Sequence, residues 1–193
     1  LFTGNLREEE ARKYAQEIED TFDHVEVKTQ DIPEDSAVNI TGNNLVWREV
    51  NKVPNALEDA ILNIYQYGPL TKEGFAYLKL VEYLMSNEAY TYLRTEKNLG
   101  YIAFLYSDVI SNVLSLNILV QGSTLDCVGM DREIETFLGK MLEKVEKLSD
   151  DEFQKSKDAL NGNLQTPDTS IRERGSRFAP RIRDKTYAFN LRE

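Results

Sequence analysis

The sequence predicts an α+β fold in which an antiparallel sheet packs against helices. Stretches with the two-residue period of strands and stretches with the period of helices occur in clusters, which disfavours the strict alternation of a parallel α/β fold. Hydrophobic side chains make up 41% of the 193 residues and charged ones 29%, the mixture of an ordinary globular protein. A chain of this length spans one domain and part of another, and it can bury a core without disulfides or metals.

The first predicted element is an amphipathic helix close to the amino terminus. Its apolar positions recur at helical spacing and are Ala11, Tyr14, Ala15, Ile18 and Phe22. Asn5 is the expected N-cap, and the three glutamates at 8–10 suit the positive end of the helix dipole. The stretch 28–36 has little periodicity and contains a proline, so it predicts a linker between two domains, 1–36 and 37–193.

The second stretch begins with strands and continues with helices and further strands. The predicted strands are 37–41, 45–51, 60–67, 102–106 and 113–121. In the last of these, apolar residues at 114, 116, 118 and 120 alternate with the polar residues Ser115 and Asn117. This alternation predicts a strand with one buried face.

Four helices are predicted among and after these strands. They are a long helix that begins at Thr71, a short helix over 88–95, a helix over 126–148 and a helix that begins at the capping box Ser-Asp-Asp-Glu of 149–152. The expected core positions of the last two are Ile134, Phe137, Leu138, Met141, Leu142, Val145, Leu148, Phe153 and Leu160. From Ser170 onward the pattern is helical, with an expected interruption at Pro180.

Charge and composition narrow the classes of partner. The chain carries 23 basic and 33 acidic side chains, a net charge of −10, which disfavours nucleic acid as the main partner. It contains no run of about 18 apolar residues, so no membrane-spanning helix is predicted. The single cysteine, Cys127, excludes an intrachain disulfide and fits a reducing compartment. A cytoplasmic location is therefore expected, with an organelle left open.

For most of the potentially reactive side chains, a structural role is favoured over a catalytic or metal-binding one. With His24 as the only histidine, the chain cannot supply the three protein ligands of a usual catalytic zinc, and His24 is expected in a surface loop. Cys127 is expected to be an inert, partly buried thiol, and a thiol of lowered pKa at a helix start is the alternative. The acidic runs at 8–10 and 150–152 are expected as helix-start residues instead of a cation site.

The stretch 172–185 is locally basic, with six basic residues and two acidic ones. A solvated helix face, or salt bridges to the acidic remainder of the chain, is the favoured interpretation. An anion-binding site is the alternative.

One segment favours chemistry over a purely structural role. Arg94 and Tyr101 lie where a predicted helix ends and a strand begins, and Gly100 between them allows a tight backbone passage. A guanidinium and a phenol directed at one point can hold a carbonyl oxygen that gains negative charge. On spacing alone, the alternative is an arginine that caps the carboxyl end of a helix.

The run Leu93-Arg94-Thr95-Glu96-Lys97-Asn98-Leu99-Gly100-Tyr101 closely resembles a motif of the insulin-degrading enzyme group, within the pitrilysin or insulinase family of zinc metallopeptidases. The opening Leu1-Phe2-Thr3-Gly4-Asn5 resembles the strand–helix unit that closes the third domain of those enzymes. Further similarities follow in matching order at Ile64-Tyr65-Gln66, at Val120-Gln121 and at Leu148-Ser149-Asp150-Asp151-Glu152-Phe153-Gln154-Lys155. The resemblance covers essentially the whole chain.

The resemblance implies four related α+β domains, of the mitochondrial processing peptidase type, in two halves that close around a peptide. The amino-terminal half carries zinc on a His-x-x-Glu-His motif whose glutamate is the general base. This chain lacks the motif, so it resembles the carboxy-terminal half, and no residue of it is expected to be catalytic or to bind metal. Residues 1–36 would end the third domain, and 37–193 would form a fourth domain that is incomplete at its carboxyl end.

The resemblance also implies the partners and the contact residues. Arg94 and Tyr101 are expected to contact a backbone carbonyl of the peptide substrate, and the amino-terminal half of the same polypeptide is the expected partner that holds Zn²⁺. A homodimer of the parent protein is left open, and the chain alone is expected to be inactive. The alternative is a catalytically dead structural or interaction domain of the same family. A general anion-binding module that uses 172–185 is a third hypothesis.

Overall fold

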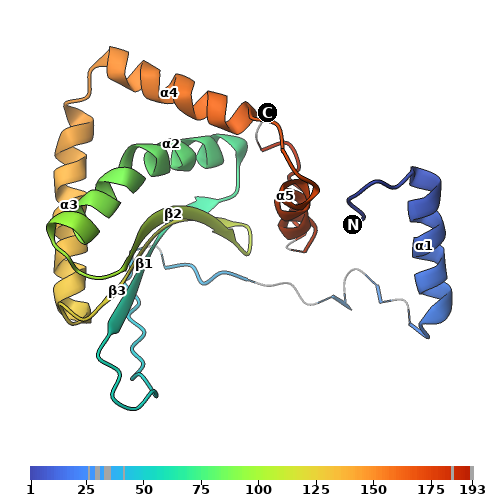
Figure 1. Cartoon of the computed structure of the whole chain (residues 1–193), viewed down its shortest axis with the longest axis horizontal. Helices are drawn as coiled ribbons and strands as arrows, with labels where there is room; N and C mark the ends of the chain where they lie inside the picture. Colours follow the sequence, from blue (N-terminus) through green and yellow to red (C-terminus); the bar gives the residue numbers. More distant parts are fainter. Residues whose placement is uncertain (26, 29–30, 33–35, 41, 184, 192–193) are drawn as a thin grey trace. The chain divides into compact units, whose positions relative to one another are not determined.

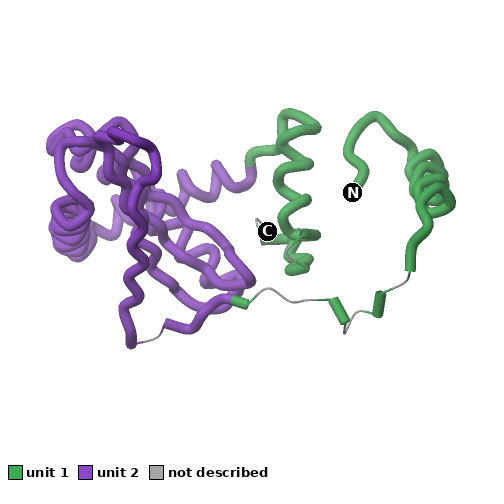
Figure 2. The backbone as a smooth tube through the Cα atoms, turned by 90° about the horizontal axis from the view of Figure 1, so that it is seen from below, with its two compact units in different colours: residues 1–36, 166–191, 193 green, residues 37–165, 192 purple. Residues whose placement is uncertain are grey.

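The chain forms two compact units. The structure, a computed structural model, describes residues 1–25, 27–28, 31–32, 36–40, 42–183 and 185–191. One unit combines 1–36 with 166–191, and the other consists of 37–165 (Figure 2). The first segment ends at the linker that the sequence predicts, whereas 166–191 groups with that segment. The assignment of 1–36 and 37–193 to a third and a fourth family domain remains a prediction.

The larger unit is built on a three-stranded antiparallel sheet. β1 (Asp59–Pro69), β2 (Ile102–Ile110) and β3 (Val113–Gly122) pair in the order β1-β3-β2, so the last strand along the chain is the central one (Figure 1). A two-residue turn joins β2 to β3, and both of its residues, Ser111 and Asn112, have positive φ. This backbone conformation suits the twist of a hairpin. The predicted α+β fold with antiparallel pairing is confirmed.

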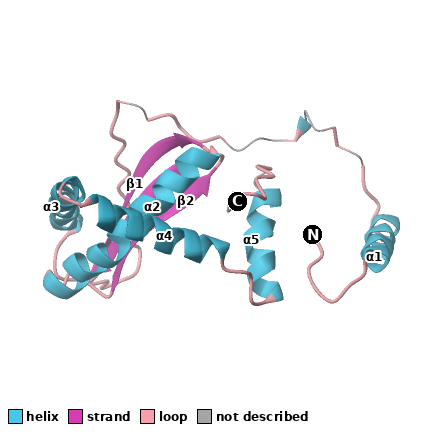
Figure 3. Ribbon diagram, turned by 90° about the horizontal axis from the view of Figure 1, so that it is seen from above, coloured by secondary structure: helices cyan, strands magenta, loops and turns pink. Residues whose placement is uncertain are grey.

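Helices cover one face of this sheet (Figures 1 and 3). α2 (Lys72–Ala89) begins after Thr71, whose side chain accepts a hydrogen bond from the backbone N–H of Gly74. The helix continues directly into a π-helix, η2 (Tyr90–Glu96). α3 (Cys127–Glu146) begins after Asp126 with an equivalent cap, and α4 (Asp150–Gln165) follows and lies against α2.

The core joins the inner face of the sheet to α2, η2 and α3. Its buried members are Met85, Ala89, Tyr92, Leu93, Leu99, Ala103, Leu105, Ile118, Val120, Met130, Ile134, Phe137 and Met141. Two of them, Tyr92 and Leu93, belong to η2. The π-helix η2, which carries Arg94, is therefore anchored in the core by Tyr92 and Leu93, whereas Tyr90 on the same helix is exposed.

In the part of the smaller unit that the structure describes, the helices are α1 (Glu8–Thr21) and α5 (Ile171–Arg183). No residue of either helix is buried. Asp168 lies just before α5. Its carboxylate oxygen Oδ2 forms an ion pair with Nη2 of Arg177 at 2.6 Å and lies 3.9 Å from Nε of Arg174. The basic stretch thus forms the salt bridges that its sequence favours. Among the helices that the structure describes, none has the length and apolar character to cross a bilayer.

The predicted strands 37–41 and 45–51 do not form, as far as these residues are described; Thr41 lies outside the described residues. The described stretches 36–40 and 42–51 contain no strand, and Trp47 is 89% exposed. Gln66 of β1 donates a side-chain hydrogen bond to the carbonyl of Val38 at 3.1 Å, but no ladder follows. A strand needs a neighbour's backbone to complete its hydrogen bonds, and an alternating pattern alone does not provide that neighbour.

Several predicted boundaries of elements were also wrong. α1 begins after Arg7, whose backbone N–H donates to Glu10, and not after Asn5. Residues 1–5 contain no strand. The expected short helix at 88–95 is the last turn of α2 followed by η2. α5 continues through Pro180, although a proline at this position removes one backbone hydrogen bond and crowds the carbonyl four residues before it.

Burial differs from the predicted pattern at the centre and at the periphery. Ser115 and Asn117 of β3 are buried, although the alternating pattern predicts them on an exposed face; β3 is the central strand, with β1 and β2 paired along its two edges. Leu142, Val145 and Phe153 are exposed, so the end of α3 and the start of α4 extend beyond the core. Cys127 is exposed as well, and its thiol donates to the carbonyl of Ala60 at 3.4 Å.

A polar network ties β1 to α3 beside the core. Asn63 donates to Asp131 at 2.8 Å and to the hydroxyl of Tyr65 at 3.2 Å, and that hydroxyl donates to Glu135 at 2.9 Å. Burial, with the neighbouring carboxylates of Glu135 and Asp131, raises the pKa of Tyr65 to about 12. Because the neutral phenol is favoured in the folded state, its contribution to stability is complete below pH 10 and is lost as the pH rises.

We therefore expect the free energy of unfolding to fall more steeply between pH 10 and about pH 12 in the wild type than in Tyr65→Phe, because the pKa of Tyr65 is raised to about 12. Urea unfolding at a series of pH values measures this difference. Parallel stability profiles for the two proteins across that window would contradict the shifted pKa. Subtracting the two profiles removes the contribution of the other tyrosines and the lysines.

Candidate functional site

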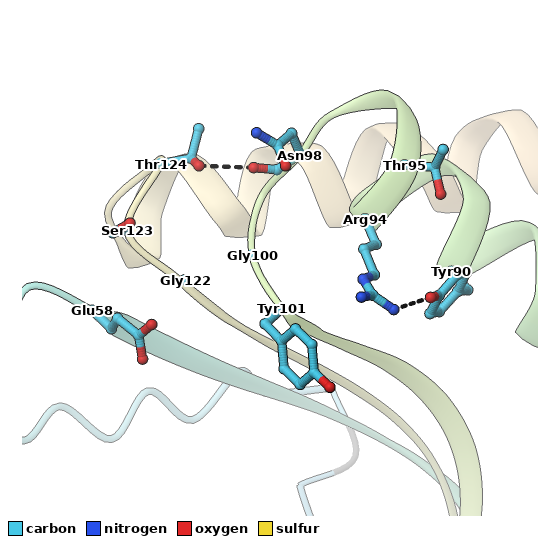
Figure 4. A pocket seen from close by; sticks show the side chains of 10 residues that line it. All are labelled: Glu58, Tyr90, Arg94, Thr95, Asn98, Gly100, Tyr101, Gly122, Ser123 and Thr124. Atoms are coloured by element: carbon cyan, nitrogen blue, oxygen red, sulfur yellow. Dashed lines mark hydrogen bonds between the residues drawn. The ribbon is translucent and has the colours of Figure 1, made fainter.

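An open pocket of about 700 Å³ lies in the larger unit, where the end of η2, the start of β2 and the end of β3 meet (Figure 4). Its lining residues are Glu58, Tyr90, Arg94, Thr95, Asn98, Gly100, Tyr101, Gly122, Ser123 and Thr124. Both residues that the sequence singles out, Arg94 and Tyr101, are among them. The pocket therefore brings the predicted pair together.

The chain reverses sharply between η2 and β2, which returns Tyr101 to the side of Arg94. The helix ends with a backbone hydrogen bond from Leu99 to the carbonyl of Leu93 at 3.0 Å, and Asn98 adopts a left-handed conformation with φ of 50°. Left-handed residues commonly end helices, and asparagine tolerates that conformation better than most side chains. The hydroxyl of Thr124 donates to the carbonyl of Asn98 at 2.7 Å and fixes the turn to the end of β3.

Two glycines allow the backbones to meet beneath the pocket. A Cβ atom placed on Gly100 would lie 1.9 Å from the carbonyl oxygen of Gln121, and one placed on Gly122 would lie 2.0 Å from the carbonyl oxygen of Leu99. Neither position has room for a side chain, since the atoms in the way belong to the backbone. The close approach of these two segments sets where β2 begins, and so where Tyr101 lies.

Arg94 is packed between two tyrosine rings. Its guanidinium carbon lies 4.9 Å from the ring centre of Tyr90 and 4.9 Å from that of Tyr101. Its Nη1 also donates a hydrogen bond to the hydroxyl of Tyr90 (Figure 4). Tyr101 is 80% exposed, so its phenol is accessible to a ligand. The arrangement offers a fixed cation and a phenol to one open volume.

An acidic residue also lines the pocket, and an ion pair fixes the adjacent end of η2. Glu58 accepts a hydrogen bond from the side chain of Gln121 at 2.8 Å. Lys97, just after η2, lies 3.0 Å from Glu133 of α3. The hydrogen bond to Glu133 raises the pKa of Lys97, and the hydrogen bonds from Lys97 and then Tyr92 lower the pKa of Glu133. These contacts hold the end of η2 against α3.

The remaining candidate residues lie outside this pocket. His24 lies in an exposed loop, where its Nδ1 is 2.9 Å from the carbonyl of Phe22. Among the described residues, no three histidine, cysteine, aspartate or glutamate side chains gather as a metal ion would require. With one histidine and one cysteine, the chain does not fit a catalytic zinc site.

Sequence reasoning missed Tyr90 and Glu58 as members of the site. A signal for Tyr90 was present, because residues four apart on a helix are neighbours and Tyr90 precedes Arg94 by four. Glu58 had no such signal, since its contact with Gln121 joins residues far apart in the chain.

The class of this domain follows from the protein family that its sequence matches. The family described as PQQ synthase PqqF-like, C-terminal lobe domain 4, matches residues 80–179. The chain belongs to this family of C-terminal lobe domains, within the PqqF-like and pitrilysin group. The resemblance found in the sequence is confirmed.

Relatives and a solved structure agree with this assignment. The chain is 33% identical to insulin-degrading enzyme of Drosophila melanogaster over 129 residues, which cover 66% of the chain and 13% of that protein. It is 28% identical over its whole length to the Schizosaccharomyces pombe protein mug138, whose name contains the words zinc protease, and covers 20% of it. The crystal structure of pitrilysin matches 98% of the chain with a TM-score of 0.66 at 17% identity, which shows the shared fold. The chain spans 20% of that structure.

Proposed function

We propose that this chain is the carboxy-terminal, non-catalytic part of an insulin-degrading-enzyme-like zinc metalloendopeptidase. In this proposal it completes the closed substrate chamber, and Arg94 and Tyr101 contact a backbone carbonyl of the peptide. Zinc and the general base belong to the amino-terminal half of the same polypeptide. The chain spans a fifth or less of the curated relatives that it matches, which fits such a division of labour.

One observation carries the proposal. The guanidinium of Arg94 lies against the ring of Tyr101 at 4.9 Å, and both line one open pocket. Donors held in advance near one point stabilise a carbonyl oxygen that gains negative charge, because they need little rearrangement during the reaction. An arginine used only to cap a helix would not need an exposed phenol beside it.

The isolated chain tests the division of labour directly. We expect it to bind zinc at far below one ion per chain and to leave a fluorogenic peptide uncut, because it has one histidine and one cysteine. Metal analysis of the purified chain and a peptidase assay with added zinc measure both. Chelator-sensitive cleavage by pure material would overturn the proposal.

A catalytically dead structural domain of the same family is the competing function. The two differ in what the reading frame encodes upstream of Leu1. A His-x-x-Glu-His motif there supports the peptidase, and its absence supports the structural domain. We also propose that the full-length protein resides in the cytoplasm. Expression of that protein would test this location and would show whether it forms a homodimer.

A further inference from the structure

Tyr90 contacts Arg94 in two ways that are independent of any ligand. Its hydroxyl oxygen accepts a hydrogen bond from Nη1 of Arg94, and its ring lies 4.9 Å from the guanidinium carbon. Tyr90 is the first residue of η2 and Arg94 the fifth, so the two side chains are neighbours on the helix surface (Figure 4). The nearby ring and the hydrogen bond together restrict the orientations that the guanidinium can adopt.

This restriction matters because the guanidinium is a planar fork with five N–H donors. An exposed arginine samples many rotamers, and ordering it on ligand binding costs free energy. A guanidinium that already lies against Tyr90 and Tyr101 is partly ordered before the ligand arrives, so less free energy is lost on binding. One donor is occupied by the Tyr90 hydroxyl, and the others stay available to a carbonyl oxygen.

We propose that Tyr90 is a positioning residue that orients Arg94 for the peptide carbonyl. The effect on peptide binding rests on the proposed function, whereas the restraint of Arg94 by Tyr90 does not. The hydroxyl of Tyr90 restricts the rotation of the guanidinium, and the ring beside it limits where the side chain can move.

A general structural role for the Tyr90 hydroxyl is disfavoured by its surroundings. Tyr90 is 39% exposed, whereas its neighbours Ala89, Tyr92 and Leu93 are buried and supply the packing of this segment. Removing the hydroxyl should therefore leave the unfolding midpoint unchanged. Tyr83 of α2, 38% exposed and absent from the residues that line the pocket, provides a matched control for loss of a tyrosine hydroxyl.

The first arm of the test observes the arginine side chain of the free chain by nitrogen-15 NMR. We expect the Nη protons of Arg94 to show slow rotation about the Nε–Cζ bond in the wild type and in Tyr83→Phe. Fast, averaged rotation is expected in Tyr90→Phe. Equal rotation rates in all three proteins would overturn the inference, whatever the pocket binds.

The second arm titrates the same chains with a terminally blocked, unstructured peptide of about ten residues. We expect Tyr90→Phe to raise the Kd about two- to tenfold, the range for the loss of one hydrogen bond. In the background of Arg94→Ala it should have no further effect, because the two residues act as one unit. Additive effects would show that Tyr90 acts independently of Arg94 and would overturn the inference.

The two arms separate the failure of the inference from that of the proposed function. If Arg94→Ala weakens binding and Tyr90→Phe does not, the positioning role is wrong and the peptide site stands. If Arg94→Ala leaves binding unchanged, the peptide site is wrong, and the rotation of the guanidinium alone decides whether Tyr90 orients it.

Discussion

Gly122→Ala is expected to lower the unfolding midpoint of the chain by about 10 °C. Overpacking a tight contact costs about 1–3 kcal/mol, and each kcal/mol lowers the midpoint of a domain of this size by about 2–4 °C. The upper part of that range is expected, because the added Cβ would lie 2.0 Å from the backbone oxygen of Leu99. Relief requires β3 and the segment before β2 to separate, and that movement displaces Tyr101 from Arg94. Thermal unfolding followed by circular dichroism measures the effect.

A second glycine provides the control for this substitution. A Cβ on Gly139, within α3, meets no atom within 4 Å. Gly139→Ala should leave the midpoint unchanged or raise it, because alanine favours a helix by about 1 kcal/mol over glycine. If Gly122→Ala and Gly139→Ala behaved alike, the close approach of the two backbones would not exist in solution.

Arg94→Ala and Tyr101→Phe are each expected to lower kcat of the full-length peptidase by about ten- to a thousandfold. Loss of one preorganised donor to a developing oxyanion has effects of this size. Stability should change little, because Arg94 is half-buried and Tyr101 is 80% exposed, and neither belongs to the core. Steady-state kinetics with an unstructured peptide, which gives kcat and kcat/KM separately, is the measurement.

Arg12→Ala controls for the loss of an arginine, because Arg12 lies on α1 and forms an exposed ion pair with Glu8 at 2.7 Å. Tyr83→Phe controls for the loss of a phenol hydroxyl away from the pocket. Unchanged kcat/KM in both Arg94→Ala and Tyr101→Phe would remove the substrate-contact role. A change in Arg12→Ala of the same size would point to a general effect of charge.

Local sequence signals predicted the elements that local contacts stabilise. The capping box at Ser149 forms, with its hydroxyl 2.6 Å from the carboxylate of Glu152, and Thr71 caps α2 as the pattern indicates. The strands that pair in the sheet were found as well, because each has apolar positions on the face that the helices cover. Where a neighbour decides the outcome, the prediction was wrong: Trp47 and its surroundings have strand character but no pairing partner among the described strands.

In the candidate site too, the features that depend on nearby residues were predicted, and those that depend on residues far apart in the chain were not. Arg94 and Tyr101 were selected from a short segment, and the structure brings them together in one pocket. The means of doing so could not be predicted, because it depends on the contact of Gly100 with the distant Gly122. The π-helix was also missed, and it decides which residues of 90–96 face the core and which face the pocket.

The contact of Arg94 and Tyr101 with a peptide carbonyl can be tested most directly by observing that carbonyl. The isolated chain is mixed with an unstructured peptide that carries carbon-13 at one backbone carbonyl at a time, and the carbonyl chemical shift is recorded by NMR at saturating chain. We expect one carbonyl to move strongly downfield, as hydrogen bonding to a cation requires, and we expect this shift to be lost in Arg94→Ala and reduced in Tyr101→Phe. A peptide that binds with no carbonyl shift, or with the same shift in Arg94→Ala, would contradict it.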